Sequence, residues 1–397
     1  MTPRRRRSRP VTWVVVVVIA AVFAAALVAD AAVMQLVIPV ALVALVVRLL
    51  LPRLRSIGDA RGPSEVDRAE RLLTAAVATL PEHRREWGRA MIGELAEVQG
   101  RSARWRFALS TARATLWTPP TSGWPVLGLV SVVVVATVAA AGPVVGQAVP
   151  GLTVFAVAFT GIFGAMVLLT VARARRPRLP TPGATLVAAA GVAASIAVTV
   201  VLLRREPAAA DYLPAAAAVC FAAVLAGCLW VGLVSPRLLG AGQLAPHLGA
   251  VAGVVFGAWF LLVNRLDGWE PPIPVALLVG IVLAAAPGAA FFVPAFVAGR
   301  AGRSLRSGVQ AVVWTLIVAM PVTYAVWLPE GMRRHAIDGR SLDGEVIAPV
   351  GANLADALIF CLAVFPVIGL TFGLLGAVLG ARTRDATAGQ PAVPEPA

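Results

Sequence analysis

The feature that most constrains this chain is a series of about ten long apolar stretches, interrupted once by a charged stretch at roughly 52–120. Each stretch is close to the ~20 residues that a helix needs to cross ~30 Å of hydrocarbon. Hydrophobic residues make up 59% of the chain and charged residues 14%, whereas soluble domains contain about 45–50% and about 25%. We therefore predict an all-α polytopic transmembrane helical bundle with a small cytosolic helical insert.

The strong positive charge follows the apolar stretches. All 34 basic residues are arginine and the net charge is +14, a balance that also occurs in nucleic-acid-binding proteins. Here, however, most arginines flank the apolar stretches on one predicted side, which is the positive-inside pattern. The expected partner is therefore the lipid bilayer, and we expect no nucleic acid.

Alternate assignment of the loops predicts the orientation. The predicted spans are 11–29, 32–51, 123–143, 149–171, 183–203, 212–233, 246–265, 273–298, 308–328 and 351–380. With the N-terminus inside, the inner segments hold 28 arginines and the outer loops hold six. This bias predicts a multi-pass protein of the cell (plasma) membrane with both termini cytoplasmic.

The N-terminus leaves one alternative open. Arginines, an apolar run and Ala29-Asp30-Ala31 also resemble a cleaved signal peptide. The apolar run is long for such a peptide and a second span follows at once, which favours a retained helix. The expected regions are the Arg-rich N-terminus with two spans (1–51), the cytosolic module (52–120), an eight-helix bundle (121–380) and a disordered cytosolic tail (381–397).

The cytosolic module has the pattern of three short amphipathic helices. Trp87 and Met91 recur at helical spacing in the second helix, and Trp105 and Leu109 do so in the third. A core this small is marginal on its own. We therefore expect these four residues to bind a partner, either a cytosolic protein or the bundle itself. The arginines of the third helix favour contact with anionic lipid.

One segment carries a resemblance. Between Leu80 and Arg113 the chain reads LPEHRREWGRAMIGELAEV and then RWRFALSTAR. This segment resembles one in uncharacterised bacterial multi-pass membrane proteins, in which a WG-x-AM-x-x-EL run is followed by a RWRFAL-like run ahead of further spans. The resemblance covers about a tenth of the chain. It implies a cytosolic module on a membrane anchor, for which a regulatory role is one expectation, and it transfers no activity and no catalytic residue.

Two spans contain glycine rows that favour close helix packing. Gly249, Gly253 and Gly257 are four residues apart in one span, as are Gly369 and Gly373 in the last. Glycines at this spacing share a helix face and let a second backbone approach closely. The partner is either another helix of this chain or a second copy, which would make the protein a homo-oligomer.

Ionisable and polar side chains within spans are the default candidates for function. Asp356 and Asn353 lie near the start of the last span, and Arg48 lies near the end of the second. We find no nucleophile–base pair, cofactor motif or metal-ligand spacing, and so expect no catalytic residue, cofactor or metal. The leading hypothesis is a non-enzymatic regulator or scaffold whose 60–118 module binds a cytosolic protein or controls the bundle. The alternative is a permease for a small or lipid-like molecule.

Overall fold

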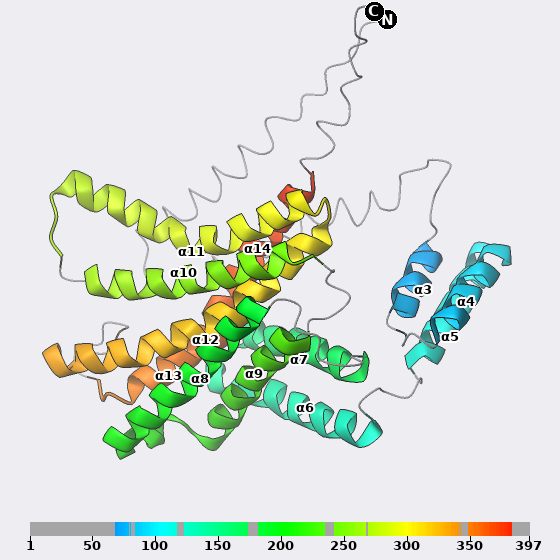
Figure 1. Ribbon diagram of the computed structural model, residues 1–397. Helices are drawn as coiled ribbons and strands as arrows, with labels where there is room; N and C mark the ends of the chain where they lie inside the picture. Colours follow the sequence, from blue (N-terminus) through cyan, green and yellow to red (C-terminus); the bar gives the residue numbers. More distant parts are fainter. Residues whose placement is uncertain are drawn as a thin grey trace, which may run out of the picture. The chain divides into compact units, whose positions relative to one another are not determined.

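The computed structural model describes residues 68–78, 80, 84–116, 123–173, 182–234, 242–266, 269–340, 342 and 348–382 (Figure 1). In these ranges every regular element is helical and no strand occurs. The chain divides into two compact units, residues 1–59 and 60–397, and the first lies outside the described residues. The predicted all-α class is thus confirmed for the part of the chain that is described.

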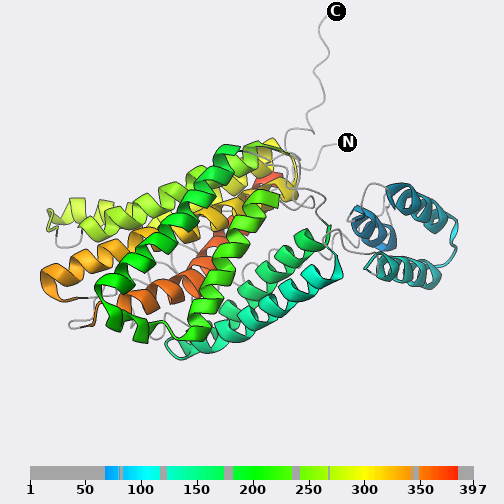
Figure 2. The same cartoon turned by 60° about the horizontal axis from the view of Figure 1, so that its bottom comes forward.

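The charged stretch forms the three expected helices, α3 (Arg68–Ala78), α4 (Arg85–Glu97) and α5 (Arg101–Leu116). Between α4 and α5 the backbone turns at Gly100, whose φ of 87° is costly for a residue with a side chain. The helices enclose a small core of their own, made by Ala69, Leu73, Val77, Leu80, Leu95 and Ala108. We call α3–α5 the module; Figure 2 shows its helices as one packed group.

Eight helices after residue 120 are long and apolar enough to cross a membrane. They are α6 (Trp124–Gly146), α7 (Thr153–Arg173), α8 (Pro182–Arg205), α9 (Ala215–Val234), α10 (Leu244–Leu266), α11 (Ile273–Ala301), α12 (Leu305–Asp338) and a last span that comprises α13 (Ala352–Ile359), a π-helical turn (Phe360–Val364) and α14 (Phe365–Arg382). Each of the eight spans predicted in this region coincides with one of these helices, which fit a membrane span by length and composition. The spans predicted at 11–29 and 32–51 lie outside the described residues, so the total of ten stays a prediction.

Helix α12 is the central element of the bundle. It packs against α8, α10, α11 and α14 (Figure 1), and it is the most buried of the eight spans. Its contacts with α8 are partly polar: the Ser195 hydroxyl donates to the Pro321 carbonyl at 2.8 Å, and Thr199 and Tyr324 share a hydrogen bond at 3.0 Å. In an apolar surrounding such bonds fix the mutual position of two helices.

Proline inside a span frees a backbone carbonyl, and at one position the structure supplies a new donor. Pro287 has no N–H, so the carbonyl four residues earlier, on Leu283, loses its helical partner. The indole Nε1 of Trp259 on α10 donates to this carbonyl at 3.0 Å. The hydrogen bond that is missing within α11 is therefore replaced by one that joins α10 to α11.

Candidate functional site

The module presents two of the four predicted partner-binding side chains to its surroundings. Trp87 is 39% exposed and Leu109 is 54% exposed. Met91 and Trp105 are half-buried and pack against the module core. Truncating either of the latter would damage the core, so Trp87 and Leu109 are the better candidates for contact with a partner.

The arginines of α5 have two different roles, internal support and exposed charge. Arg104 donates through Nη1 to the Leu95 carbonyl at 2.6 Å and to the Val98 carbonyl at 3.3 Å. It thereby satisfies carbonyls at the C-terminal end of α4, which have no helical partner of their own. Arg106 and Arg113 are exposed, and α5 contains no acidic residue. The exposed part of this helix is therefore suited to a negatively charged partner surface.

Close approach of two helices explains one glycine of the WG-x-AM run. A Cβ on Gly88 would lie 2.5 Å from Val77 Cγ1 and 3.0 Å from Leu80 Cδ1. Since real Cβ atoms do not approach so closely, α3 can pack on α4 here only because residue 88 has no side chain. Trp87 and Gly88 thus have different positions: Gly88 lies against α3 and Trp87 lies at the surface.

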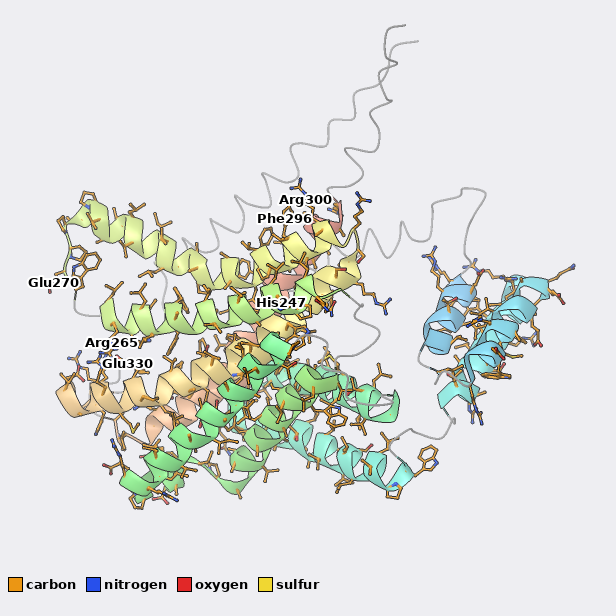
Figure 3. All side chains as sticks on the ribbon, in the orientation of Figure 1. His247, Arg265, Glu270, Phe296, Arg300 and Glu330 are labelled. Atoms are coloured by element: carbon orange, nitrogen blue, oxygen red, sulfur yellow. The ribbon has the colours of Figure 1, made fainter. Side chains whose placement is uncertain are left out.

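Within the bundle the most unusual polar group is Glu330, a carboxylate that is only 2% exposed. Arg265 of α10 approaches its Oε2 at 3.0 Å, and Arg333, one turn later on α12, donates through Nε to its Oε1 at 2.8 Å. Figure 3 shows Arg265 and Glu330 directed toward each other at one end of the bundle. We call this the Glu330 end.

The span predicted at 308–328 leaves Glu330 in the following loop, whereas in the structure Glu330 lies within α12. The predicted span ended at residue 328, whereas α12 continues through Pro329 to Asp338 and ends at Gly339, which has a φ of 71°. The spacing of Glu330 and Arg333 by three residues, together with Arg265 at the end of another span, was the available signal. Each carboxylate oxygen is bound by an arginine, and the bond to Arg265 joins α12 to α10.

Aromatic rings pack below this charged group, toward the middle of α12. Trp327 is 7% exposed and stacks on Phe260 with ring centroids 4.8 Å apart; its ring also meets Phe360 at 5.1 Å. These rings come from α10, α12 and the π-helical turn. Ring contacts therefore join α10, α12 and the last span about one turn before Glu330.

The predicted polar residues of the last span meet different surroundings. Asn353 is buried and its carboxamide binds backbone on both sides: Oδ1 accepts from Leu342 N–H at 3.1 Å, and Nδ2 donates to the Val350 carbonyl at 3.2 Å. Asp356 lies one turn later and is half-buried. Asn353 therefore fastens the connection between α12 and α13, and Arg48 lies outside the described residues.

Both glycine rows are in contact with other helices of this chain. A Cβ on Gly249 would meet the Ala311 carbonyl of α12 at 2.7 Å, and one on Gly253 would meet Ala319 N at 2.8 Å; Gly257 faces Val322. In the last span Gly369 faces Leu316 and Phe291, and Gly373 faces Val312. Both rows therefore lie where helices of this chain approach each other closely.

The described part of the chain therefore offers two candidate functional surfaces, the exposed residues of the module and the charged cluster at the Glu330 end. Neither assembles a nucleophile with a base, and among the described residues no group of three His, Cys, Asp or Glu side chains is placed to hold a metal ion. Comparison with protein-family models, with curated proteins and with solved structures found no match to this chain.

Proposed function

We propose that this protein is a non-enzymatic membrane regulator or scaffold, whose module binds a cytosolic protein. The observation that carries the proposal is the combination of a self-contained module core with exposed Trp87 and Leu109. Tryptophan is among the side chains that most often dominate the energy of protein–protein contacts, and exposed apolar side chains such as Leu109 can extend the apolar surface that a partner covers. In a chain otherwise made of membrane spans, this is the part suited to a water-soluble partner.

The charge of the module indicates the kind of partner. Arg101, Arg106 and Arg113 are exposed on a helix that has no acidic residue. A partner that fits would present an apolar patch for Trp87 and Leu109, with acidic side chains at its rim. Such rim charges raise the association rate and contribute less to the final affinity.

Affinity purification of the full chain from membranes tests this proposal. We compare wild type with a Trp87→Ala/Leu109→Ala variant and with a Trp269→Ala/Leu277→Ala control, whose two side chains are 49% and 63% exposed outside the module. We expect a cytosolic protein to be captured by wild type and by the control but to be lost with the module variant.

Reconstitution then decides whether the contact is direct. The purified partner is titrated against wild type in detergent, and we expect the module variant to bind at least about a hundredfold more weakly, as for loss of two central apolar anchors. The proposal is contradicted if the partner binds wild type and the module variant equally. It is also contradicted if wild type, the module variant and the control all capture no cytosolic protein.

A second candidate function is transport of a small or lipid-like molecule, and one observation favours it. Glu330 is a buried carboxylate inside a candidate span, and intramembrane ionisable residues frequently belong to substrate pathways. We expect Glu330→Gln to change the tolerance of cells to a panel of amphiphilic toxic compounds, whereas Glu270→Gln at the same end leaves it unchanged. Equal tolerance of both variants at equal protein abundance counts against transport.

A further inference from the structure

An apolar cavity of about 350 Å³ lies between α6, α7 and α9. Its walls include Val130, Val133 and Val134 of α6, Phe163 and Val167 of α7, and Trp230 of α9. Figures 1 and 2 both show α6 and α7 side by side, and α9 packs against both helices. All three helices are candidate membrane spans, so the surrounding solvent for this cavity is lipid.

Small residues keep this space open. Gly164 of α7 and Gly227 of α9 both line the cavity. A Cβ on Gly227 would lie 2.6 Å from Phe163 Cε1, and one on Gly164 would collide with Val134. The Phe163 ring therefore packs on the backbone of Gly227, and Val134 packs on the backbone of Gly164. They fill the space that side chains at positions 227 and 164 would occupy.

Every hydrogen-bonding side chain in the wall is already engaged within the protein. The hydroxyl of Thr137 donates to the Val133 carbonyl at 2.7 Å, and that of Thr160 donates to the Ala156 carbonyl, also at 2.7 Å. Trp230 Nε1 donates to Thr170 Oγ1 at 2.8 Å. The other lining residues are glycine, alanine, valine, leucine and phenylalanine. The wall therefore offers an occupant apolar contact alone, with no charge and no uncommitted polar side chain.

We propose that this cavity binds one hydrocarbon chain of a membrane phospholipid. A ligand with polar groups would lose their hydration without gaining a hydrogen bond from these side chains, which is costly. A saturated chain has no polar group that needs a hydrogen bond, and it can make dispersion contacts with the valine, leucine and phenylalanine side chains of the wall. The volume also falls within the range of ~300–1,000 Å³ that is typical of ligand pockets. The proposal does not depend on whether the module binds a partner.

Photolabelling of the full chain in vesicles tests the proposal. The probe is a phosphatidylcholine that carries a diazirine midway along one acyl chain, diluted into phosphatidylcholine vesicles. After irradiation, mass spectrometry of peptides locates the labelled residues. We expect labelling to concentrate on the cavity walls in α6, α7 and α9, above the level on the exposed Leu277, Leu278 and Ile281 of α11.

Matched variants distinguish the cavity from general contact with lipid. Val133→Trp places a large ring in the cavity, whereas Val132→Trp places the same ring on a neighbouring position that is 67% exposed and does not line it. We expect Val133→Trp to lower labelling of the α7 and α9 walls to the level measured on α11, because the ring fills the space that the acyl chain would occupy. Val132→Trp leaves labelling unchanged.

A second pair covers the case in which Val133→Trp does not fold. Ala226 lines the cavity and Ala222, one turn earlier on α9, is exposed and does not. Ala226→Phe should reduce labelling of the α6 and α7 walls, and Ala222→Phe should not. Labelling spread evenly over the cavity and α11, or labelling that neither cavity variant lowers, overturns the proposal.

Discussion

At the scale of single residues, Glu330 is a buried carboxylate whose burial is not evident from the residues next to it in sequence. Pro329 precedes it, and proline ordinarily marks the end of a helix. In α12, however, both Pro321 and Pro329 lie within a continuous helix, because packed neighbours can satisfy what proline leaves open in a membrane span. The Glu330–Arg333 spacing can be read from the sequence, but Arg265 is 65 positions earlier in the chain. Its pairing with Glu330 depends on how α10 packs on α12, which a local pattern does not predict.

The first prediction concerns this carboxylate. Glu330→Gln removes the negative charge between Arg265 and Arg333, while the side-chain volume is retained. Because Arg265 is 54% exposed, solvent screens part of the loss, and we expect the free energy of unfolding to fall by about 1–2 kcal/mol. Unfolding by sodium dodecyl sulfate in mixed micelles measures this change.

Glu270→Gln is the control for this measurement, since Glu270 is an exposed carboxylate at the same end of the bundle (Figure 3). We expect it to change the free energy of unfolding by less than ~0.5 kcal/mol. Equal effects of the two substitutions would show that the Arg265–Glu330 pair does not stabilise the contact between α10 and α12.

At the scale of helices, the spacing of glycines predicts which face of a helix is closely packed, but it does not predict which helix packs there. The four-residue period of Gly249, Gly253 and Gly257 predicts a face of close approach, and in the structure this face packs against α12. It did not indicate α12 as the partner, because α12 begins at residue 305 and the choice between it and a second copy depends on the three-dimensional arrangement. The same applies to Gly369 and Gly373. In the module, the helical spacing predicts three helices. It does not predict the hydrogen bonds by which Arg104 holds α5 against the end of α4.

The second prediction tests the contact between α10 and α12. In Gly253→Val, the new Cβ would lie 2.7 Å from Val318 Cγ1 and 2.8 Å from Ala319 N. Because the latter is backbone, the helices have to separate, and we expect a loss of about 1–3 kcal/mol in the free energy of unfolding. Denaturation in mixed micelles provides the measurement.

Gly280→Val supplies the matched control, since no atom lies within 4 Å of a Cβ at Gly280 on α11. It introduces the same side chain into a membrane-length helix but meets open space. We expect its stability to stay within ~0.5 kcal/mol of wild type. A loss at Gly280 as large as that at Gly253 would mean that the valine itself, rather than its collision with α12, causes the effect.

At the scale of the whole molecule, the eight described spans agree with the hydropathy pattern, and the orientation rests on arginine placement alone. α12 has 34 residues and rises about 51 Å, which exceeds the ~30 Å of hydrocarbon that a span must cross. The helix therefore tilts or extends into the headgroup region. Its last turns, with Arg333 and Arg334, are then near one membrane surface, where arginine can reach water.

The third prediction fixes the orientation. With both termini cytoplasmic, the turn before α11 faces outward and the turn after it faces inward. We expect a membrane-impermeant maleimide to label Glu270→Cys in intact cells and to label Arg300→Cys only after permeabilisation. Cys220, Cys228 and Cys361 are buried and should give little background. The opposite labelling pattern would reverse the topology.

The central position of α12 has a consequence for biosynthesis. Ribosomes deliver the chain from its N-terminus, so α6 to α11 emerge before the helix against which α8 and α10 pack. Until residue 305 and beyond have been translated, the glycine face of α10 has only lipid or a wrong helix to contact. Translation beyond this point therefore completes the interior of the bundle, and a chain arrested earlier would be a natural substrate for membrane proteases.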